Sequence, residues 1–303
     1  MMRRLGASSL CAAYPKGGGL KSGGFHVAQV RLGSLKGASP DLFEKGLAQR
    51  KATLGAEYVE KNLAAADDFS RPFQEAMTAW CWGFGWGDTV IDVKVRSMMN
   101  LAMIGALGKM HEWELHCKGA LNNGVTALEI RAVVHVIGIY AGVPQAVECF
   151  RSARTVLEAA GKLPVAPESE SSSKAALAPS NPFEIGLAQR KATLGAEYVE
   201  KNLAAADDLT RPFQEAMTAW CWGFGWGDAV IDVKVRSMMN LAMIGALGKM
   251  HEWELHCKGA INNGVTRDEI RAIIHVVGIY CGVPQAVECF RSARKVLEEE
   301  GLL

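Results

Sequence analysis

No stretch of this sequence is apolar for long enough to cross a membrane as a helix, which needs about 18 consecutive apolar residues. The longest apolar runs are 98–108 and 133–144, and they are interrupted by Asn100 and His135. With 49% hydrophobic and 21% charged residues, the composition is instead that of a globular protein with a buried core. We therefore expect no membrane span.

The eight cysteines lack the spacing of a metal or disulfide site. No two of them are separated by only two residues, and none combines with histidines at the intervals of a zinc site. We therefore predict no metal site. We expect most of the cysteines to be buried, apolar side chains in a reducing compartment.

Acidic residues are absent from the first 40 residues, which hold six basic ones. This segment is also rich in Ser, Gly and Ala, and such a composition is typical of an organellar transit peptide. We predict import into an organelle, the mitochondrion before the plastid. The alternative is a tail without a targeting role on a cytoplasmic protein.

The rest of the chain carries 27 basic and 32 acidic residues, which is a net charge of −5. A surface that binds nucleic acid needs clustered positive charge, because much of its affinity comes from phosphate contacts. A mildly acidic body offers no such surface. We therefore expect no nucleic-acid partner.

A long internal repeat organises the chain. Residues 46–158 align without a gap to residues 186–298, and only 11 of these 113 positions differ. A repeat of this length is large enough for a hydrophobic core of its own, so it indicates two domains rather than a solenoid. The predicted divisions are a leader (1–40), a first copy (41–160), a flexible linker rich in Pro and Ser (161–182) and a second copy (183–303).

Each copy has the sequence pattern of helices, and no stretch alternates between apolar and polar residues as a strand would. Gly55 interrupts the first helical stretch, Asp92 is placed to cap a later helix, and Thr126 with Glu129 has the spacing of a capping box. We predict an all-α fold with about six helices per copy. In the first copy we expect helices at 42–67 with an interruption, from Ser70 toward Trp82, and at 93–107, 111–121, 130–140 and 145–158, with a loop rich in Gly and Trp at 83–88.

The pair best placed for chemistry is Glu112 and His116. Because they are four residues apart on a predicted helix, their side chains share a face. A carboxylate beside an imidazole raises the pKa of the imidazole and fixes its tautomer, which makes a general acid or base near neutral pH. An exposed pair without a catalytic role is the alternative. The second copy has the same pair at Glu252 and His256.

Other residues are weaker candidates for a binding site. Arg96 is near this pair in the sequence, and Asn123 belongs to an Asn-Asn-Gly turn that could present amide donors. Trp86 could line a pocket, although a packing role is more ordinary. His135 belongs to an apolar helix, where a core or interface role is more common than catalysis. The equivalent residues of the second copy are Arg236, Asn263, Trp226 and His275.

One long motif is specific to a family. The run ELHCKGALNNGVTALEIRAVVHVIGIYAGVPQAVECFRSAR, residues 114–154, resembles 4-carboxymuconolactone decarboxylases. The spacing of Gly46 and Arg50, the position of Trp86, and Asp92-x-Lys94-x-Arg96-Ser97 fit the same family. The resemblance covers about 115 residues of each copy. It implies a helical domain of the wider alkylhydroperoxidase D-like superfamily, and a decarboxylase that needs no cofactor.

The resemblance also implies a substrate class and an assembly. The substrate is expected to be a small carboxylated lactone or a related acid, and the enzyme must stabilise the electrons that CO2 leaves behind and then protonate the carbon. Family members form ring-shaped hexamers of single domains, so the resemblance implies that three two-domain chains form the same ring. A compact two-domain monomer is the alternative. The predicted roles are proton shuttle for His116 and orienting partner for Glu112. Arg96 would anchor a carboxylate or stabilise the enolate, and His135, Trp86 and Asn123 would contact the substrate.

One departure from the family pattern leaves other functions open. Asp88, and Asp228 in the second copy, stands where the family usually has an arginine, and an acid there would repel an anionic lactone. A non-catalytic or repurposed accessory subunit of an organelle is therefore the second hypothesis. A peroxidase of the wider superfamily is the third, although its two cysteine positions hold Lys109 and Glu112 here.

Overall fold

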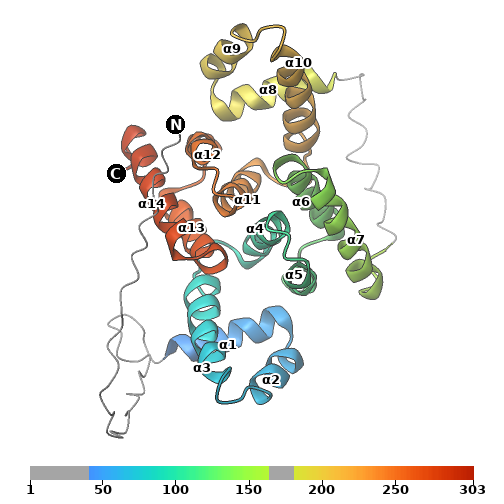
Figure 1. Cartoon of the computed structure of the whole chain (residues 1–303), viewed down its shortest axis with the longest axis vertical. Helices are drawn as coiled ribbons and strands as arrows, with labels where there is room; N and C mark the ends of the chain where they lie inside the picture. The colour runs from blue at the N-terminus through green and yellow to red at the C-terminus, as the bar shows by residue number, and fades with distance from the viewer. Residues whose placement is uncertain (1–40, 164–180) are drawn as a thin grey trace, which may run out of the picture.

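The computed structural model describes residues 41–163 and 181–303, which form helices and no strand (Figure 1). The all-α prediction is therefore confirmed for this part of the chain. The predicted leader and residues 164–180 of the predicted linker lie outside the described residues. Within the two described ranges, no helix is both long and apolar enough to span a membrane.

Each copy contains seven α-helices and one π-helical segment, slightly more than the six helices predicted. The first copy consists of α1 (Asp41–Leu54), α2 (Ala56–Ala64), α3 (Arg71–Met77), η2 (Thr78–Trp86), α4 (Val93–Ala106), α5 (Met110–Asn122), α6 (Ala127–Tyr140) and α7 (Val143–Ala159). The second copy consists of α8 (Pro182–Leu194), α9 (Ala196–Ala204), α10 (Arg211–Met217), η3 (Thr218–Trp226), α11 (Val233–Ala246), α12 (Met250–Asn262), α13 (Arg267–Cys281) and α14 (Val283–Glu299).

Local sequence signals explain most of the helix ends. Gly55 has a φ of 93°, a conformation that favours glycine, and it separates α1 from α2. The side chain of Asp92 accepts a hydrogen bond from the backbone N–H of Lys94 at the start of α4. Thr126 and Glu129 form the predicted capping box at the start of α6. The same caps recur 140 residues later, so the two copies fold alike.

The segment predicted as a loop at 83–88 is helical through Trp86. It is the end of the π-helix η2, a form that is frequent at functional sites. Gly83 and Gly85 are there for close packing and not for a turn: a Cβ atom at Gly83 would collide with the carbonyl oxygen of Leu42, and one at Gly85 would collide with the side chain of Ile279. The prediction of a loop was wrong because glycine in a sequence is a signal for a turn as well as for close packing.

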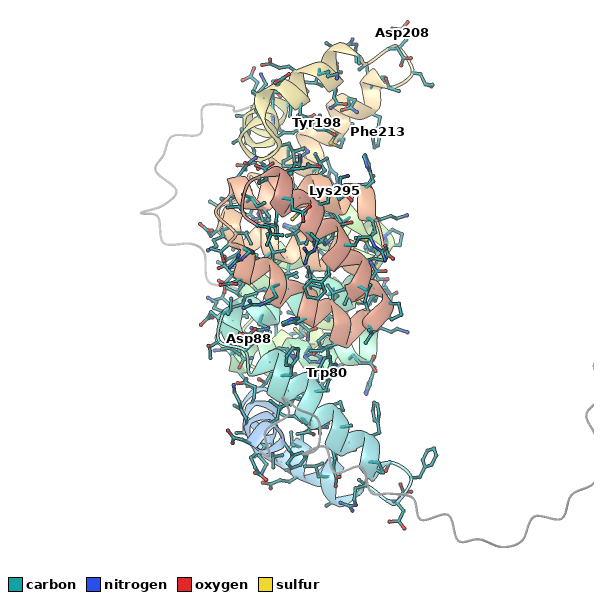
Figure 2. All side chains as sticks on the ribbon, turned by 90° about the vertical axis from the view of Figure 1, so that its left-hand side faces the viewer. Trp80, Asp88, Tyr198, Asp208, Phe213 and Lys295 are labelled. Atoms are coloured by element: carbon teal, nitrogen blue, oxygen red, sulfur yellow. The ribbon has the colours of Figure 1, made fainter. Side chains whose placement is uncertain are left out.

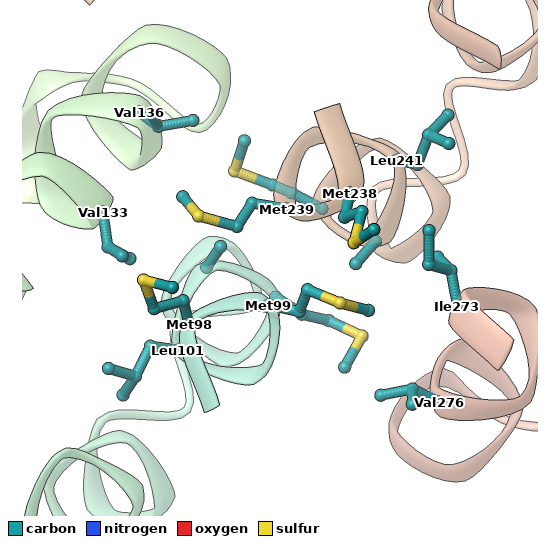
Figure 3. Close-up of a cluster of buried hydrophobic side chains, with 14 of the residues drawn as sticks. Met98, Met99, Leu101, Val133, Val136, Met238, Met239, Leu241, Ile273 and Val276 are labelled. Atoms are coloured by element: carbon teal, nitrogen blue, oxygen red, sulfur yellow. The ribbon is translucent and has the colours of Figure 1, made fainter. Parts of the chain in front are cut away.

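The two copies share one core. Helices α4 and α11 lie together at the centre of the molecule, with α6 and α13 beside them (Figure 1). Four methionines from these central helices, Met98, Met99, Met238 and Met239, lie among the buried side chains between the copies (Figure 3). The buried residues of both copies form one continuous hydrophobic cluster. The first three helices of each copy lie at opposite ends of the molecule (Figure 1).

The contact between the copies is reciprocal. Helix α13 of the second copy packs on η2 of the first, and α6 of the first copy packs on η3 of the second. Ile279 and Tyr280, at the end of α13, pack against the buried pair Trp82 and Trp86. Each π-helical segment is therefore covered by the other copy, and this exchange determines how the cavities beside these segments are built.

Candidate active site

Each copy has one cavity beside its π-helical segment, and the other copy completes it. The first cavity has a volume of about 590 Å³, and the second has a volume of about 520 Å³. Helices α1, α2, α3, η2 and α5 form most of the first cavity, and Ile279 and Tyr280 of α13 add the rest of its wall. Ile139 and Tyr140 of α6 do the same for the second cavity. Tyr198, which lies in the wall of that cavity, is labelled in Figure 2.

The imidazole of His116 is buried in an aromatic wall. The residue lines the first cavity and is only 8% exposed. Its ring stacks against Trp82 and Trp86, with centroid distances of 6.1 and 5.9 Å, and it meets the ring of Tyr280 edge-on at 5.8 Å. In the second cavity, His256 has the equivalent neighbours Trp222, Trp226 and Tyr140.

Asn100 fixes the tautomer of His116. Its amide nitrogen Nδ2 lies 2.9 Å from Nδ1 of His116 and 3.2 Å from the hydroxyl oxygen of Tyr280. Because an amide nitrogen only donates, Nδ1 of the imidazole accepts, and the neutral ring carries its hydrogen on Nε2. With Nδ1 engaged, Nε2 is the nitrogen that can serve a molecule in the cavity. Asn240 makes the same two contacts with His256 and Tyr140.

The orientation of the Asn100 amide follows from its burial. In the arrangement described, its carbonyl oxygen is the one buried polar atom of the side chain without a partner. Reversing the amide would leave two N–H donors without partners, and orphaned buried N–H groups are rarer than orphaned carbonyls. The amide therefore donates one hydrogen to His116 and the other to Tyr280.

Burial lowers the pKa of His116 to about 4, and it does the same for His256. A charged ring would lose its hydration in this aromatic wall, and no acid compensates for that loss. The imidazole is therefore neutral at physiological pH.

This neutral imidazole corrects the expectation that Glu112 orients His116 and raises its pKa. Glu112 lines the first cavity but is exposed, and the partner of Nδ1 is Asn100. Glu252 is also exposed and lies outside the lining of the second cavity.

Arg50 on α1 is a buried cation that lines the first cavity without an acidic partner. It is 4% exposed, and its guanidinium donates to the hydroxyl of Thr78 at 3.0 Å and to the side-chain oxygen of Gln74 at 3.1 Å. Its Nε has no partner, and no carboxylate is among the groups that affect its pKa, which burial lowers. A buried charge without a counterion is costly, so an anionic ligand would complete this site. Arg190 repeats the arrangement in the second cavity.

Arg96, the predicted carboxylate anchor, lies outside the lining of both cavities. It is buried, and its Nη2 donates to the backbone carbonyl oxygens of Asp88 at 2.8 Å and Ile91 at 3.3 Å. These bonds hold the connection between η2 and α4. Asp88 (Figure 2) lies outside the lining of this cavity as well. The structure therefore does not place the predicted anchor Arg96 in the cavity beside His116, and the same holds for Arg236 and Asp228 in the second copy.

The other predicted residues fall into two groups. Trp86 is beside His116, and its indole N–H donates to the hydroxyl of Tyr280 at 2.9 Å. Asn123 instead donates to a serine hydroxyl of α4 at 2.9 Å, and His135 packs on Phe224 of the other copy at 4.9 Å. None of Trp86, Asn123 and His135 is among the residues that line these two cavities. The equivalents Trp226, Asn263 and His275 are placed in the same way.

Three residues of this site were missed in the sequence: Arg50, Asn100 and Tyr280. The spacing of Gly46 and Arg50 was an available signal, since it is part of the family resemblance. Asn100 interrupts an apolar run of the sequence. Such an interruption is a signal for a buried polar residue, which needs hydrogen-bond partners. Nothing in the sequence places Tyr280 of the second copy beside His116 of the first.

Comparison with known proteins identifies the same repeat. The sequence model of the carboxymuconolactone decarboxylase family matches residues 71–155 and again 211–295. A nitrosuccinic acid decarboxylase from Metarhizium robertsii is 45% identical over 117 residues, which are 39% of this chain and 82% of that protein. A 4-carboxymuconolactone decarboxylase from Acinetobacter baylyi is 29% identical over 120 residues, 40% of this chain and 90% of that protein. Each match is about as long as one copy, and together they confirm the resemblance inferred from residues 114–154.

The neutral state of His116 can be observed directly. Nitrogen NMR of the imidazole rings should show His116 and His256 uncharged, with the hydrogen on Nε2, down to about pH 5. The His116→Gln, His256→Gln variant assigns the two signals.

Stability should follow the same shift. Because the pKa in the folded protein, about 4, is below the unfolded value of about 6.5, the unfolded chain binds protons first as the pH falls. The contribution of these two rings to stability is therefore constant above about pH 6.5 and decreases between pH 6.5 and 4. Imidazolium signals for these residues at pH 6 would contradict the burial argument.

Proposed function

Because the chain belongs to the carboxymuconolactone decarboxylase family, we propose that each of its cavities removes CO2 from a small acid that carries two carboxyl groups. One observation carries this proposal. A buried arginine without an acidic partner and a neutral imidazole with a free Nε2–H line the same cavity, in both copies. The reaction uses no cofactor.

Arg50 binds the carboxylate that remains in the product. A guanidinium holds a carboxylate through two parallel, charge-assisted hydrogen bonds, and the neutral partners of Arg50 leave its charge available for such a ligand. In the free protein this buried charge has no counterion. Binding a dianionic substrate therefore supplies the missing anion and orients the second carboxylate in the cavity.

The aromatic wall destabilises the carboxylate that leaves. Trp82 lines the cavity and stacks at 5.0 Å on Trp86, and both are almost completely buried, so this wall offers little hydration to a negative charge beside Trp82. A carboxylate held there is poorly solvated, and it loses its charge when it departs as neutral CO2. The wall therefore destabilises the bound carboxylate relative to CO2 and favours cleavage of the carbon–carbon bond.

His116 stabilises the charge that CO2 leaves behind. The bonding electrons move into an electron-accepting group of the substrate, and negative charge develops on an oxygen of that group. The Nε2–H of a neutral imidazole is a fixed donor for this oxygen, and the ring that carries it is almost completely buried. We therefore assign His116 and His256 the role of hydrogen-bond donor to the developing anion.

The substrate class follows from these three requirements. The acid needs one carboxylate to be held, one to be lost, and an electron-accepting group beside the second. Nitrosuccinic acid and 4-carboxymuconolactone, on which the two relatives are named to act, both meet them. We propose a compact acid similar to nitrosuccinic acid as the better candidate, because the nitrosuccinic acid decarboxylase is the more similar of the two relatives.

The peroxidase alternative receives no support from the thiols. Burial raises the pKa of Cys81 and of Cys117 to about 12, so both remain protonated at physiological pH. A dithiol peroxidase needs a thiolate that peroxide can reach. The accessory-subunit alternative is also weaker, because both cavities keep the buried arginine, the neutral histidine and the tyrosine of the other copy.

Decarboxylation can be assayed directly. Purified protein given nitrosuccinic acid, or separately 4-carboxymuconolactone, should release CO2 from one of them, and peroxide with a dithiol reductant should not be consumed. The His116→Ala, His256→Ala variant should lose about 10²- to 10³-fold in kcat, the effect of removing one donor to a developing oxyanion. Undiminished turnover in that variant would remove His116 from the mechanism.

The carboxylate anchor can be tested with a matched pair of arginine variants. Arg50→Met with Arg190→Met should lower kcat/KM by about 10- to 150-fold through a higher KM, because a charged hydrogen bond to the substrate is lost. Arg96→Met with Arg236→Met also removes two buried guanidiniums, but it should lower thermal stability and leave KM unchanged. An equal rise of KM in both variants would contradict the assignment of Arg50.

We also propose that three chains assemble into a ring. Val143, Val147 and Phe150 share one face of α7 and are 59%, 45% and 39% exposed. An apolar face of this kind marks an interaction surface when another copy is available to cover it. The equivalent face on α14 has Val283, Val287 and Phe290, so each chain offers two faces and a closed ring covers all of them.

The assembly predicts a mass in solution. Three chains of 32.7 kDa should sediment at about 98 kDa, or less if a leader is removed. Val147→Glu with Val287→Glu should shift the mass to that of a single chain. Sedimentation of the unmodified protein as a single chain would refute the ring. The organellar location predicted from the leader remains a prediction.

A further inference from the structure

The hydroxyl oxygen of Tyr280 is surrounded by hydrogen-bond donors of the other copy. The indole N–H of Trp86 donates to it at 2.9 Å, the amide of Asn100 at 3.2 Å, and the thiol of Cys81 at 3.8 Å. A phenol oxygen has two lone pairs for such donors, and a phenolate has a third. These surroundings therefore fit the charge that this oxygen would carry after losing its proton.

The hydroxyl hydrogen of Tyr280 has few hydrogen-bond acceptors within reach in the protein without a substrate. Both strong contacts of its oxygen are donors, so the hydroxyl hydrogen can point only toward the weakly accepting sulfur of Cys81 or into the cavity that Tyr280 lines. Burial raises the pKa of Tyr280, while the N–H donors of Trp86 and Asn100 oppose that change. The phenol therefore keeps its proton until a strong base, such as a carbanion, forms beside it.

The other polar groups of the cavity are poorer proton donors. His116 is neutral, and the N–H of a neutral imidazole is a weaker acid than a phenol. Arg50 does not give up its proton. His111 and Glu112 are exposed and line only the first cavity. Tyr58 and its equivalent Tyr198 line the two cavities but are 39% exposed, whereas Tyr280 and Tyr140 meet the rings of the buried histidines.

We propose that Tyr280 protonates the carbanion that remains after CO2 loss in the first cavity, and that Tyr140 does so in the second. In nitrosuccinic acid the protonated carbon is the one that lost CO2, and in 4-carboxymuconolactone it is the carbon beside the lactone carbonyl. This inference rests on the proposed decarboxylase function. The carbon–carbon bond breaks, CO2 departs, and its electron pair passes into the substrate's electron-accepting group. The pair then forms a new C–H bond with the hydroxyl proton, which leaves a phenolate held by Trp86, Asn100 and Cys81. Water returns a proton to the phenolate, so each turnover consumes one proton from solvent.

The geometry divides each active site between the copies. His116 and Tyr140 belong to the first copy, but His116 serves the first cavity and Tyr140 the second. His116 and Tyr280 belong to different copies but to the same cavity. Two double variants can therefore contain the same pair of substitutions and differ only in which cavities they affect.

The test compares these two double variants in the full chain, with whichever of nitrosuccinic acid and 4-carboxymuconolactone the unmodified protein decarboxylates. His116→Ala with Tyr280→Phe damages the first cavity only and should keep about half of the turnover per chain. His116→Ala with Tyr140→Phe damages both cavities and should lose at least about 10²-fold, the usual contribution of a positioned acid. Thermal unfolding of both variants confirms that they are folded.

Each outcome decides the proposal. Half activity in both variants would show that the tyrosines are not needed, and loss only in the Tyr280 variant would show that each copy works alone. Loss in both folded variants would show a structural effect reaching across the molecule. Any of these results overturns the proposal, while CO2 release by the unmodified protein keeps the decarboxylase function. Absence of CO2 release from the unmodified protein would instead overturn both.

A second measurement separates proton donation from mere positioning. Turnover in D2O by the unmodified protein should place deuterium on one face of the carbon that receives the proton, because a fixed hydroxyl delivers it. In the Tyr140→Phe, Tyr280→Phe variant the residual product should carry deuterium on both faces, because solvent then protonates the released anion. Deuterium on a single face in that variant would exclude the tyrosines as proton donors.

Discussion

The side-chain amide of Asn100 is the contact on which both the fold and the site depend. It is completely buried on α4, at the centre of the molecule, and it uses its two hydrogens on groups that come from different copies: His116 of the first and Tyr280 of the second. Because the amide donates to Nδ1, the imidazole is neutral and presents Nε2–H to the cavity. Because the amide also donates to the hydroxyl of Tyr280, it links the end of α13 to the first copy. The same amide therefore contributes both to the packing between the copies and to the orientation of the polar groups in each cavity.

A second constraint is electrostatic. Arg50 is a buried cation with neutral partners, and such a charge is costly unless a ligand brings an anion. His116 lines the same cavity and is uncharged, so the cavity offers a cation for one carboxylate and a neutral donor in an aromatic wall for the other. In the proposed reaction, this difference separates the carboxylate that is held from the carboxylate that is lost. Duplication doubles the arrangement within one chain, and the reciprocal tyrosines make the two sites depend on each other's copy.

The sequence predicted the helices well because their ends are encoded locally. Gly55, the cap at Asp92 and the capping box of Thr126 and Glu129 act within a few residues, and each was confirmed. The segment 83–88 was predicted wrongly because the reason for its glycines lies elsewhere in the chain, at Leu42 and Ile279. The site shows the same division. His116 is in a specific motif and was found, whereas its true partner Asn100 and the tyrosine from the other copy depend on tertiary packing. Sequence proximity to His116 favours Arg96 over Arg50. Proximity along the chain, however, does not show which arginine side chain faces a cavity.

The central claim is that each cavity holds a dicarboxylic acid between an arginine of one copy and a tyrosine of the other. A crystal structure of the protein with an unreactive dicarboxylate, such as succinate, tests it most directly. We expect one carboxylate to pair with the guanidinium of Arg50 and the other to lie within hydrogen-bond distance of Nε2 of His116 and the hydroxyl of Tyr280. The same arrangement is expected at Arg190, His256 and Tyr140. A dicarboxylate bound at Arg96, or at Arg50 with its second carboxylate turned out to solvent, would contradict it.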